Sequence, residues 1–262
     1  MSVRLDAWLV SHGVFGGRDT AKRHIAAGEV RVNGQVVRRP AAPVGADDAV
    51  TCDGGERYVG RGGYKLEKAL GMTAIPLDGA VALDVGASTG GFTDCMLQNG
   101  ARRVYAVDVG HDQLHPLLRA NPAVVCLEGT DIREPDISRK IPERPTVCSI
   151  DVSFISLKQV LPAALALLAE DAWLVCLIKP QFEAGRAAVG KSGVVKDPAA
   201  HRAVLADVCA AFTALGCGRV CLTYSPIRGG EGNVEYLAVL RRGAPDCPVD
   251  IRTVVDEALH AL

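Results

Sequence analysis

The sequence reads Val81-Ala82-Leu83-Asp84-Val85-Gly86-Ala87-Ser88-Thr89-Gly90-Gly91-Phe92 where an apolar strand runs into a glycine-containing loop and the start of a helix. Glycines there let the main chain approach a ligand closely at the N-terminus of the helix. A dinucleotide cofactor favours the pattern G-x-G-x-x-G, which this loop does not have. The alternative is an ordinary strand-to-helix turn that binds nothing.

Two acidic residues indicate what the loop binds. Asp84 precedes the first glycine closely, and Asp108 ends the next expected strand. An acid there, about 20 residues past the turn, can accept hydrogen bonds from ribose hydroxyls. Asp84 favours a ligand with positive charge, such as the sulfonium and amino groups of S-adenosylmethionine. The loop and the second acid together predict a nucleoside-bearing cofactor rather than an ordinary turn.

From Tyr64 onward the apolar pattern alternates between strand and helix, which predicts an α/β domain with a mostly parallel sheet. The expected strands are Val81–Val85, Val104–Val109, Val124–Leu127, Val147–Asp151, Trp173–Ile178, Arg219–Thr223 and Val234–Leu240. The expected helices are Tyr64–Leu70, Gly91–Asn99, Gln113–Arg119, Leu157–Leu168 and Ala199–Leu215. Pro162 lies inside the fourth helix and predicts a late start or a kink.

Residues 1–56 are expected to form a small separate domain of two short helices and a hairpin. Gly28 is a plausible end of the second helix, and Asn33-Gly34 is a strong hairpin signal. Residues 1–39 contain seven Lys and Arg against three Asp and Glu. A local basic excess of this kind is typical of a module that faces RNA or DNA, although an ordinary solvated surface is the alternative.

Residues 57–63 are expected to form a flexible, basic linker, and residues 64–262 a second domain. We assign RNA contacts to basic residues of the first domain and of the linker. They are Arg4, Arg18, Lys22, Arg23, Arg31, Arg57 and Arg61.

Composition excludes several classes of protein. The net charge is −1, so the whole chain is not a general polyanion binder. None of the nine cysteines forms a C-x-x-C pair, which favours free thiols in a reducing cytoplasm and predicts no metal site. No apolar stretch approaches the ~18 residues of a membrane span. The start of the chain lacks the apolar core of a signal peptide.

Lys179 lies where the apolar run Trp173–Ile178 ends, in the phrase Ile178-Lys179-Pro180-Gln181-Phe182-Glu183. The carboxyl edge of such a sheet is where ligands bind, and partial burial can turn a lysine into a base. Asp151, Glu235 and Lys65 are expected near the same edge. Each one alone is more often a surface charge, but four ionisable groups at one edge indicate a site.

A second motif is expected to be accidental. Gly185–Ser192 satisfies the P-loop expression G-x-x-x-x-G-K-[ST], but Gly193–Pro198 after it is poor helix material. A phosphate-binding loop of that type needs a helix that begins at its lysine. We therefore do not predict nucleotide hydrolysis.

Four phrases together resemble the TlyA family of rRNA 2′-O-methyltransferases, whose members are often called hemolysin A. They are Leu83–Thr93, Asp151–Leu157, Ile178–Glu183 and Gly232–Glu235. The resemblance covers nearly the whole chain. It implies an N-terminal RNA-binding domain of ribosomal-protein-S-four type. It further implies an FtsJ-like methyltransferase domain with a Rossmann-like, mostly parallel seven-stranded sheet and helices on both faces.

The resemblance also implies a catalytic Lys-Asp-Lys-Glu tetrad, which falls on Lys65, Asp151, Lys179 and Glu235. The implied cofactor is S-adenosylmethionine, and the implied partners are rRNA and ribosomal subunits, with cytidine as the target. The expected cofactor-binding residues are Asp84, Gly86, Ala87, Ser88, Thr89, Gly90, Gly91, Phe92, Asp108, Val109 and Asp131.

The chain departs from the family pattern at three positions. Gly60 stands where a serine is common, Pro116 where a large aromatic is usual, and Asp131 where asparagine is more usual. The first can change the conformation of the linker, and the third bears on the expected adenine contact.

The resulting hypothesis is methyl transfer to a ribose 2′-hydroxyl of rRNA, with Lys179 as the base. Two alternatives stay open: a membrane-active hemolysin, and a ribosome-assembly factor that binds RNA without catalysis. The absence of an apolar span speaks against the first. The intact tetrad speaks against the second. The oligomeric state is open.

Overall fold

A computed structural model describes residues 2–12, 14–15, 17–53, 57–185, 189–190 and 193–262, and the chain divides into two compact units, Met1–Gly60 and Arg61–Leu262. The domain end expected at residue 56 lies outside the described residues, as does much of the candidate P-loop at Gly185–Ser192. Gly62 and Gly63 begin a helix instead of completing a linker. Within the described residues, no helix is long and apolar enough to cross a membrane.

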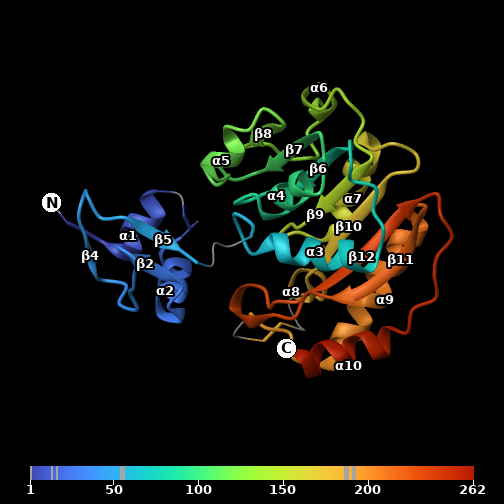
Figure 1. The fold of residues 1–262 in the computed structure, drawn as a ribbon. Coiled ribbons are helices and arrows are strands. Elements are labelled where there is room, and N and C mark those ends of the chain that lie inside the picture. The colour runs from blue at the N-terminus through green and yellow to red at the C-terminus, as the bar shows by residue number, and fades with distance from the viewer. Residues whose placement is uncertain (1, 13, 16, 54–56, 186–188, 191–192) are drawn as a thin grey trace. The chain divides into compact units, whose positions relative to one another are not determined.

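The N-terminal unit packs two helices against short strands (Figure 1). Helices α1 (Leu5–Ser11) and α2 (Arg18–Ala27) contribute Leu5, Leu9, Ala21 and Ile25 to its core. Strands β1 (Val3–Arg4) and β4 (Pro43–Val44) pair antiparallel, and β3 (Gln35–Val36), β2 (Val30–Val32) and β5 (Val50–Cys52) form a small sheet in that order.

Two turn predictions in this unit are confirmed. Asn33 and Gly34 have φ angles of 52° and 78°, the left-handed pair that a two-residue hairpin turn requires. Gly28, with φ of 83°, ends α2 in the left-handed conformation.

The larger unit is built on a seven-stranded sheet. In spatial order its strands are β11 (Cys217–Tyr224), β12 (Tyr236–Arg242), β10 (Trp173–Ile178), β9 (Val147–Ile150), β6 (Val81–Val85), β7 (Arg103–Asp108) and β8 (Val124–Glu128). From β10 to β8 all neighbours are parallel, whereas β12 is antiparallel to both β10 and β11. The predicted mostly parallel seven-stranded sheet is confirmed.

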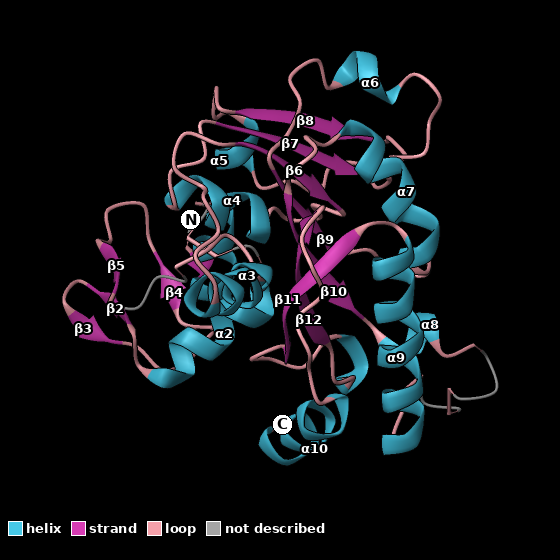
Figure 2. Cartoon of the chain, turned by 90° about the vertical axis from the view of Figure 1, so that its right-hand side faces the viewer, coloured by secondary structure: helices cyan, strands magenta, loops and turns pink. Residues whose placement is uncertain are grey.

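Helices cover both faces of the sheet. Figure 2 shows α3 (Gly62–Met72) and α4 (Gly91–Gln98) on one face, and α7 (Leu157–Leu167) and α9 (Pro198–Ala214) on the other. Helix α10 (Ile251–Ala261) packs against α9 and β11. Short helices α5 (Pro116–Arg119), α6 (Ile137–Lys140) and α8 (Pro180–Glu183) and the 3-10 turn η2 (Gly230–Gly232) lie in the connections.

Two local predictions need correction. The helix expected from Gln113 is limited to α5, because His115 precedes Pro116 and is extended, with ψ of 137°. Helix α7 begins at Leu157 and continues through Pro162, so its start is not late. Pro180 begins α8, since a proline in the first turn lacks only an N–H that would have no partner there.

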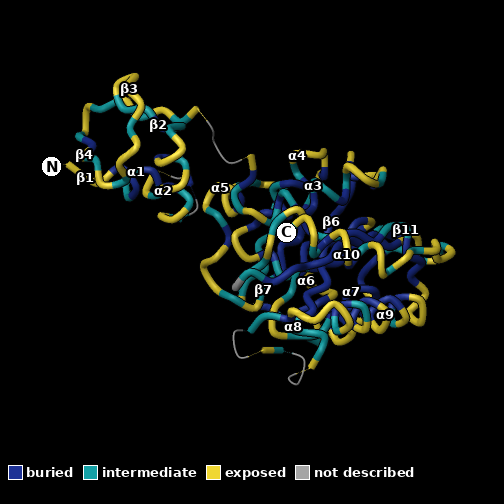
Figure 3. The backbone as a smooth tube through the Cα atoms, turned by 90° about the horizontal axis from the view of Figure 1, so that it is seen from below, coloured by how far each residue is buried: buried dark blue, intermediate teal, exposed yellow. Residues whose placement is uncertain are grey.

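The sheet is buried on both faces, which explains its continuous apolar strands. All five residues of β6 are buried, and Figure 3 shows buried backbone through the middle of this unit. The chain order reverses between β6 and β9, because β7 and β8 extend the sheet on one side and β9 and β10 on the other. Ligands of open α/β sheets bind at the carboxyl ends of the strands beside such a point.

Candidate functional site

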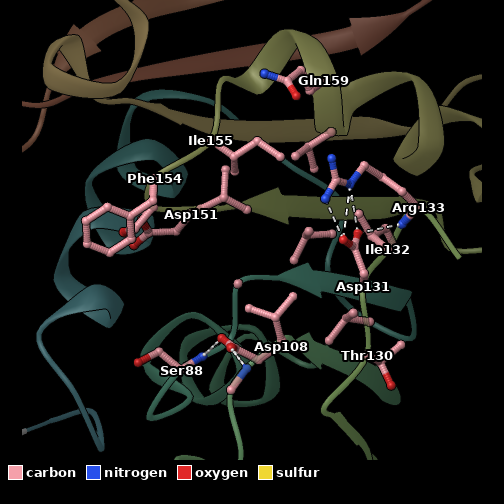
Figure 4. A pocket seen from close by; sticks show the side chains of 18 of the residues that line it. Ser88, Asp108, Thr130, Asp131, Ile132, Arg133, Asp151, Phe154, Ile155 and Gln159 are labelled. Atoms are coloured by element: carbon pink, nitrogen blue, oxygen red, sulfur yellow. Dashed lines mark hydrogen bonds and ion pairs between the residues drawn. The ribbon is translucent and has the colours of Figure 1, made fainter. Parts of the chain in front are cut away.

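A cavity of about 670 Å³ opens at the carboxyl ends of β6, β7 and β9 (Figure 4). Five residues predicted to bind the cofactor line it: Gly86, Ser88, Asp108, Val109 and Asp131. The volume is in the range of cavities that hold small molecules and cofactors.

Asp108 organises the floor of this cavity. Its Oδ2 accepts a hydrogen bond from the Ser88 N–H at 2.7 Å, and its Oδ1 accepts one from the Gly110 N–H at 2.7 Å. Ser88 has a φ of 47°, so the carboxylate stabilises an unfavourable loop conformation. A carboxylate can accept about four hydrogen bonds, which leaves lone pairs for the hydroxyls of a ribose.

Gly86 brings the loop against the next strand. Its φ is +84°, and a Cβ there would stand 2.4 Å from the carbonyl oxygen of Asp151. A side chain is therefore excluded, both by the conformation and by the close contact. The close approach joins the cofactor loop to the residue that follows β9.

Glu128, which was not selected from the sequence, holds the segment that brings Gln113 to the cavity wall. Its carboxylate accepts N–H bonds from Gln113 and Leu114 at 2.7 and 2.8 Å, and a guanidinium bond from Arg119 at 2.6 Å. Burial alone would raise the pKa of Glu128, but these hydrogen bonds outweigh burial and lower it to about 2. The carboxylate thus fixes the segment that carries Gln113 into the cavity wall.

Asp131 also lines the larger cavity, and its carboxylate pairs with Arg133 at 2.6 Å (Figure 4). The hydrogen bond from Arg133 lowers the pKa of Asp131. The group is therefore an ionised acceptor that can receive a hydrogen bond from an amino group. An aspartate in place of asparagine keeps this capacity.

Two residues of the predicted cofactor set line neither this cavity nor the neighbouring one. Asp84 is fully buried, and its carboxylate accepts bonds from Thr93 and Ser149 hydroxyls, each at 2.7 Å. Burial raises the pKa of Asp84 to about 6. Gly90, with φ of +95°, packs against Leu118. The expected direct contacts are corrected: both residues hold the loop from behind.

A second cavity of about 250 Å³ adjoins the first through Gly86 and Ser88. The other predicted cofactor residues, Ala87, Thr89, Gly91 and Phe92, line it. All four members of the predicted tetrad also line it: Lys65, Asp151, Lys179 and Glu235. The cofactor loop and the tetrad therefore meet at one wall.

The four charged side chains form a continuous chain of ion pairs. Lys179 Nζ lies 2.6 Å from Asp151 Oδ1, Lys65 Nζ lies 3.7 Å from Asp151 Oδ2, and Lys65 Nζ donates to Glu235 Oε2 at 2.6 Å. Lys65 and Lys179 are each only 8% exposed, and Glu235 is 2% exposed. Charges so deeply buried are tolerated because each has an opposite partner.

The sheet explains how residues so far apart in sequence come together. Asp151 directly follows β9, Lys179 directly follows β10, and Glu235 directly precedes the antiparallel β12. These strands are neighbours in the order β12-β10-β9. Lys65 comes from the first turn of α3.

Ser153 and Phe154 are further residues at this site that the sequence interpretation did not select. The Lys179 ammonium donates to Ser153 Oγ at 3.0 Å. Phe154 is 91% exposed with φ of 65°, and its ring lies 5.0 Å from that of Phe182. The main chain of a bulky residue is strained in the left-handed conformation, and such strain concentrates at functional sites. Only the place of Phe154 in the phrase after Asp151 could have indicated that it belongs to the site.

Asn233 supports the tetrad from behind. It is 2% exposed, accepts the Val195 N–H at 3.2 Å and donates to the Gly193 carbonyl at 3.0 Å. His201 Nε2 lies 2.9 Å from the Val195 carbonyl, so this nitrogen donates, and Nδ1 accepts from the Tyr236 hydroxyl at 2.8 Å. These bonds hold the segment at residues 193–195 against the start of β12, next to Glu235.

Most of the cations predicted to bind RNA lie in the N-terminal unit, and several are paired there. Arg4 and Arg18 both bind the buried Asp6, which lowers the pKa of Asp6 to about 2. Lys22 pairs with Asp19 at 2.8 Å. Of the others, Arg23 donates to Thr20, Arg31 pairs with Asp53, and Arg57 lies over the ring of Tyr58. Arg61 lies in the larger unit and lines the smaller cavity.

Comparison with known proteins assigns the chain to a family. The FtsJ-like methyltransferase model matches residues 58–242, more than half of the chain, and the S4 domain model matches residues 3–50. The chain belongs to the FtsJ-like methyltransferase family. The motifs had indicated this family, and the matches confirm it.

Similar proteins place the chain in the TlyA branch of this family. A Mycobacterium tuberculosis protein named 16S/23S rRNA (cytidine-2′-O)-methyltransferase TlyA is 44% identical, with 91% of this chain and 89% of that one covered. A Bacillus subtilis protein, named provisionally an rRNA methyltransferase, is 43% identical over 99% of this chain and 95% of its own length. A solved Streptococcus thermophilus structure, described provisionally as a hemolysin, superposes with a TM-score of 0.78 at 40% identity, covering 99% and 96% of the two chains.

Proposed function

We propose that this protein transfers a methyl group from S-adenosylmethionine to a ribose 2′-hydroxyl of rRNA, with cytidine as the target. One observation carries the proposal: the buried chain Glu235–Lys65–Asp151–Lys179 stands at the wall where the cofactor loop ends. Such a chain can remove a proton from a hydroxyl and orient it. Methyl transfer from a nucleoside cofactor needs both actions beside that loop.

The residues of the larger cavity fit S-adenosylmethionine. Asp108 has free acceptor capacity for the ribose hydroxyls, and the ionised Asp131 can accept from the amino group of adenine. Gly86 lines both cavities and lets the loop lie against the Asp151 main chain, where a side chain does not fit. When bound, S-adenosylmethionine supplies an electrophilic methyl group on a sulfonium ion.

We infer that Lys179 accepts the proton of the 2′-hydroxyl. Its Nζ lies between Asp151 and Ser153, so its direction is fixed, and its small exposed fraction keeps bulk water away. The amine must be neutral at the moment of transfer in order to accept the proton. General bases contribute roughly 10²–10⁴-fold to rate in this role.

The other three charged residues orient the reactants in this proposal. Asp151 holds Lys179 and places negative charge near the methyl donor. Lys65 and Glu235 form the tight pair that borders the cavity and can bind the ribose hydroxyl. Correct alignment of two bound reactants can lower a barrier by up to ~7–11 kcal/mol.

The substrate assignment rests on the relatives and on the N-terminal unit. The relative named above acts on rRNA cytidine, and the S4-matching residues 3–50 contain the half-exposed cations Arg4, Arg18 and Lys22. Phosphate contacts from such cations would supply affinity for RNA without reading its sequence. The nine free cysteines support a reducing, cytoplasmic compartment.

The test is to incubate purified protein with labelled S-adenosylmethionine and ribosomal subunits, then digest the RNA and identify the modified nucleosides by mass. We expect 2′-O-methylcytidine. A product methylated only on a base would contradict the proposal. RNA binding without transfer would favour the assembly factor, and leakage from liposomes treated with the protein would favour the hemolysin.

A further inference from the structure

Gln113 lines the larger cavity, and the proposed mechanism assigns it no role. It lies between β7 and α5, in a segment that the Glu128 carboxylate holds through the main-chain N–H groups of Gln113 and Leu114. The main-chain N–H of His115 donates to the Thr89 carbonyl at 3.1 Å, which ties the same segment to the cofactor loop. The place of Gln113 in the cavity wall is therefore fixed from two sides.

The amide of Gln113 lies close to the carboxylate of Asp108. Both groups approach Gly110, because a Cβ on this glycine would stand 1.8 Å from Gln113 Nε2 and 3.1 Å from Asp108 Oδ1. Since both distances start from one point, the two atoms lie at most the sum of them apart, about 4.9 Å. The main-chain N–H of Gly110 also donates to the same Oδ1 at 2.7 Å, so the glycine supports both groups.

These two groups suit a hydroxyl placed between them. A carboxylate accepts hydrogen bonds, whereas the NH2 of a glutamine amide donates them. A hydroxyl both donates and accepts, so it can donate to Asp108 and accept from Gln113 at the same time. Two such bonds of ~2.8 Å can span up to ~5.6 Å, which covers the distance between the two atoms.

The amide of Gln113 is available for this contact. Among the described residues, the hydrogen bonds of Gln113 involve only its main-chain N–H. The residue is exposed, and it borders the cavity together with Asp108 and Gly110. A ligand in the cavity can therefore reach its NH2 group.

We propose that Gln113 donates a hydrogen bond to a ribose hydroxyl of S-adenosylmethionine, the same hydroxyl that donates to Asp108, an inference that rests on the proposed function. The ribose is the part of the cofactor that Asp108 is expected to bind, so a donor beside Asp108 reaches the same group. The two residues together recognise the hydroxyl both as a donor and as an acceptor.

The test measures binding of S-adenosylhomocysteine, the cofactor without its methyl group, by titration calorimetry. Its 2′-deoxy and 3′-deoxy analogues each lack one ribose hydroxyl. Gln113→Met removes the amide at similar length and should bind S-adenosylhomocysteine roughly fivefold more weakly than the wild type. The analogue that lacks the contacted hydroxyl should bind equally to the variant and to the wild type, because the contact is already absent.

A second variant separates the donor from the size of the side chain. Gln113→Glu keeps the shape, but it replaces the NH2 donor with an acceptor and adds a negative charge near Asp108. Affinity for S-adenosylhomocysteine should fall by more than in Gln113→Met. The melting temperatures of both variants without ligand should stay near that of the wild type, because the side chain is exposed.

Gln159 supplies the matched control. It also lines the larger cavity, but it lies on α7, and Figure 4 shows it well apart from Asp108. Gln159→Met should change the affinities for S-adenosylhomocysteine and for its two analogues by one common factor.

Two results would overturn the inference. One is wild-type affinity of Gln113→Met for S-adenosylhomocysteine, and the other is a loss by one common factor against S-adenosylhomocysteine and both analogues. Binding is measured without methyl transfer, so a wild-type protein that binds S-adenosylhomocysteine but methylates no RNA would refute the proposed function separately. A wild-type protein that does not bind S-adenosylhomocysteine would refute both.

Discussion

The two cavities at the carboxyl edge of the sheet are built in different ways. The larger is shaped by main-chain N–H groups that converge on single carboxylates, Asp108 and Glu128. The smaller is shaped by side chains of opposite charge that bind each other, from four elements far apart in sequence. The first construction fixes the shape of a binding loop, and the second holds reactive groups in a buried place. The difference predicts which changes should affect binding and which should affect the rate.

The largest effect is expected from Lys179→Ala in the smaller cavity. Removal of the base should lower kcat by roughly 10²–10⁴-fold, while the dissociation constant for S-adenosylmethionine should stay near that of the wild type. Steady-state kinetics and equilibrium dialysis measure the two quantities. Lys158, a surface lysine paired with Asp207, gives the control, since Lys158→Ala should change neither. A kcat near the wild-type value in Lys179→Ala would show that Lys179 is not the base.

Next in size is the effect of Lys65→Met on stability. The substitution leaves the Glu235 carboxylate, 2% exposed, without its cation, which should cost about 4 kcal/mol in the free energy of unfolding. Adding Glu235→Leu should recover most of that loss, because no buried charge stays unpaired. Both variants should be inactive. Urea unfolding measures the stabilities, and a double variant no more stable than Lys65→Met would show that the pair is not the source of the loss.

Asp84, which holds the cofactor loop from behind, gives a test by pH dependence. Its pKa is about 6 because of burial, against 3.8 for an ordinary aspartate, so the folded state keeps the proton longer than the unfolded state. As pH rises from about 3 to about 7, stability should therefore fall by about 3 kcal/mol relative to Asp84→Asn. Urea unfolding of both proteins across this range measures the difference. A constant difference between them would contradict the assignment.

Asp108→Ala should separate binding from rate. Loss of the carboxylate leaves the Ser88 and Gly110 N–H groups without their acceptor and removes the expected ribose contacts. S-adenosylmethionine binding should therefore weaken by about 2 kcal/mol. At saturating cofactor the rate should change little. Titration calorimetry and kinetics check this, with the highly exposed Asp112→Ala as control. A fall in kcat without a change in affinity would mean that Asp108 acts in the transfer step and not in cofactor binding.

The smallest effect is expected in the N-terminal unit. Lys22 is about half exposed and pairs with the exposed Asp19. Lys22→Gln should weaken RNA binding a few-fold and reduce its salt slope by about one, with no change in the rate at saturating RNA. A filter-binding series in salt gives the slope, and an unaltered slope would exclude Lys22 from the RNA contacts.

The same contrast explains how far the sequence could predict the site. The larger cavity follows a contiguous pattern, so its glycine loop and Asp108 were found from spacing. Glu128 was missed because its role depends on main-chain groups of a segment that looked helical. Asp84 was placed in contact with the cofactor because adjacency in sequence does not show which way a strand side chain points.

The smaller cavity could be predicted only because strand ends meet at one edge. Asp151 and Lys179 were selected as residues at ends of strands, whereas their distances and the pairing of Lys65 with Glu235 depend on sheet order. Ser153 and Asn233 lie within the phrases that resemble the family, but their roles could not be read from them, because their partners are side chains or main-chain atoms far along the chain.

The central claim is that the buried chain around Lys179 acts on a ribose hydroxyl. Its most direct test uses an rRNA fragment in which the 2′-hydroxyl of the mapped target nucleotide alone is replaced by hydrogen. In a single-turnover reaction with the wild-type protein, we expect this fragment to bind with nearly unchanged affinity and to accept no methyl group. Methylation of the deoxy fragment at a rate near that of the intact RNA would contradict the account.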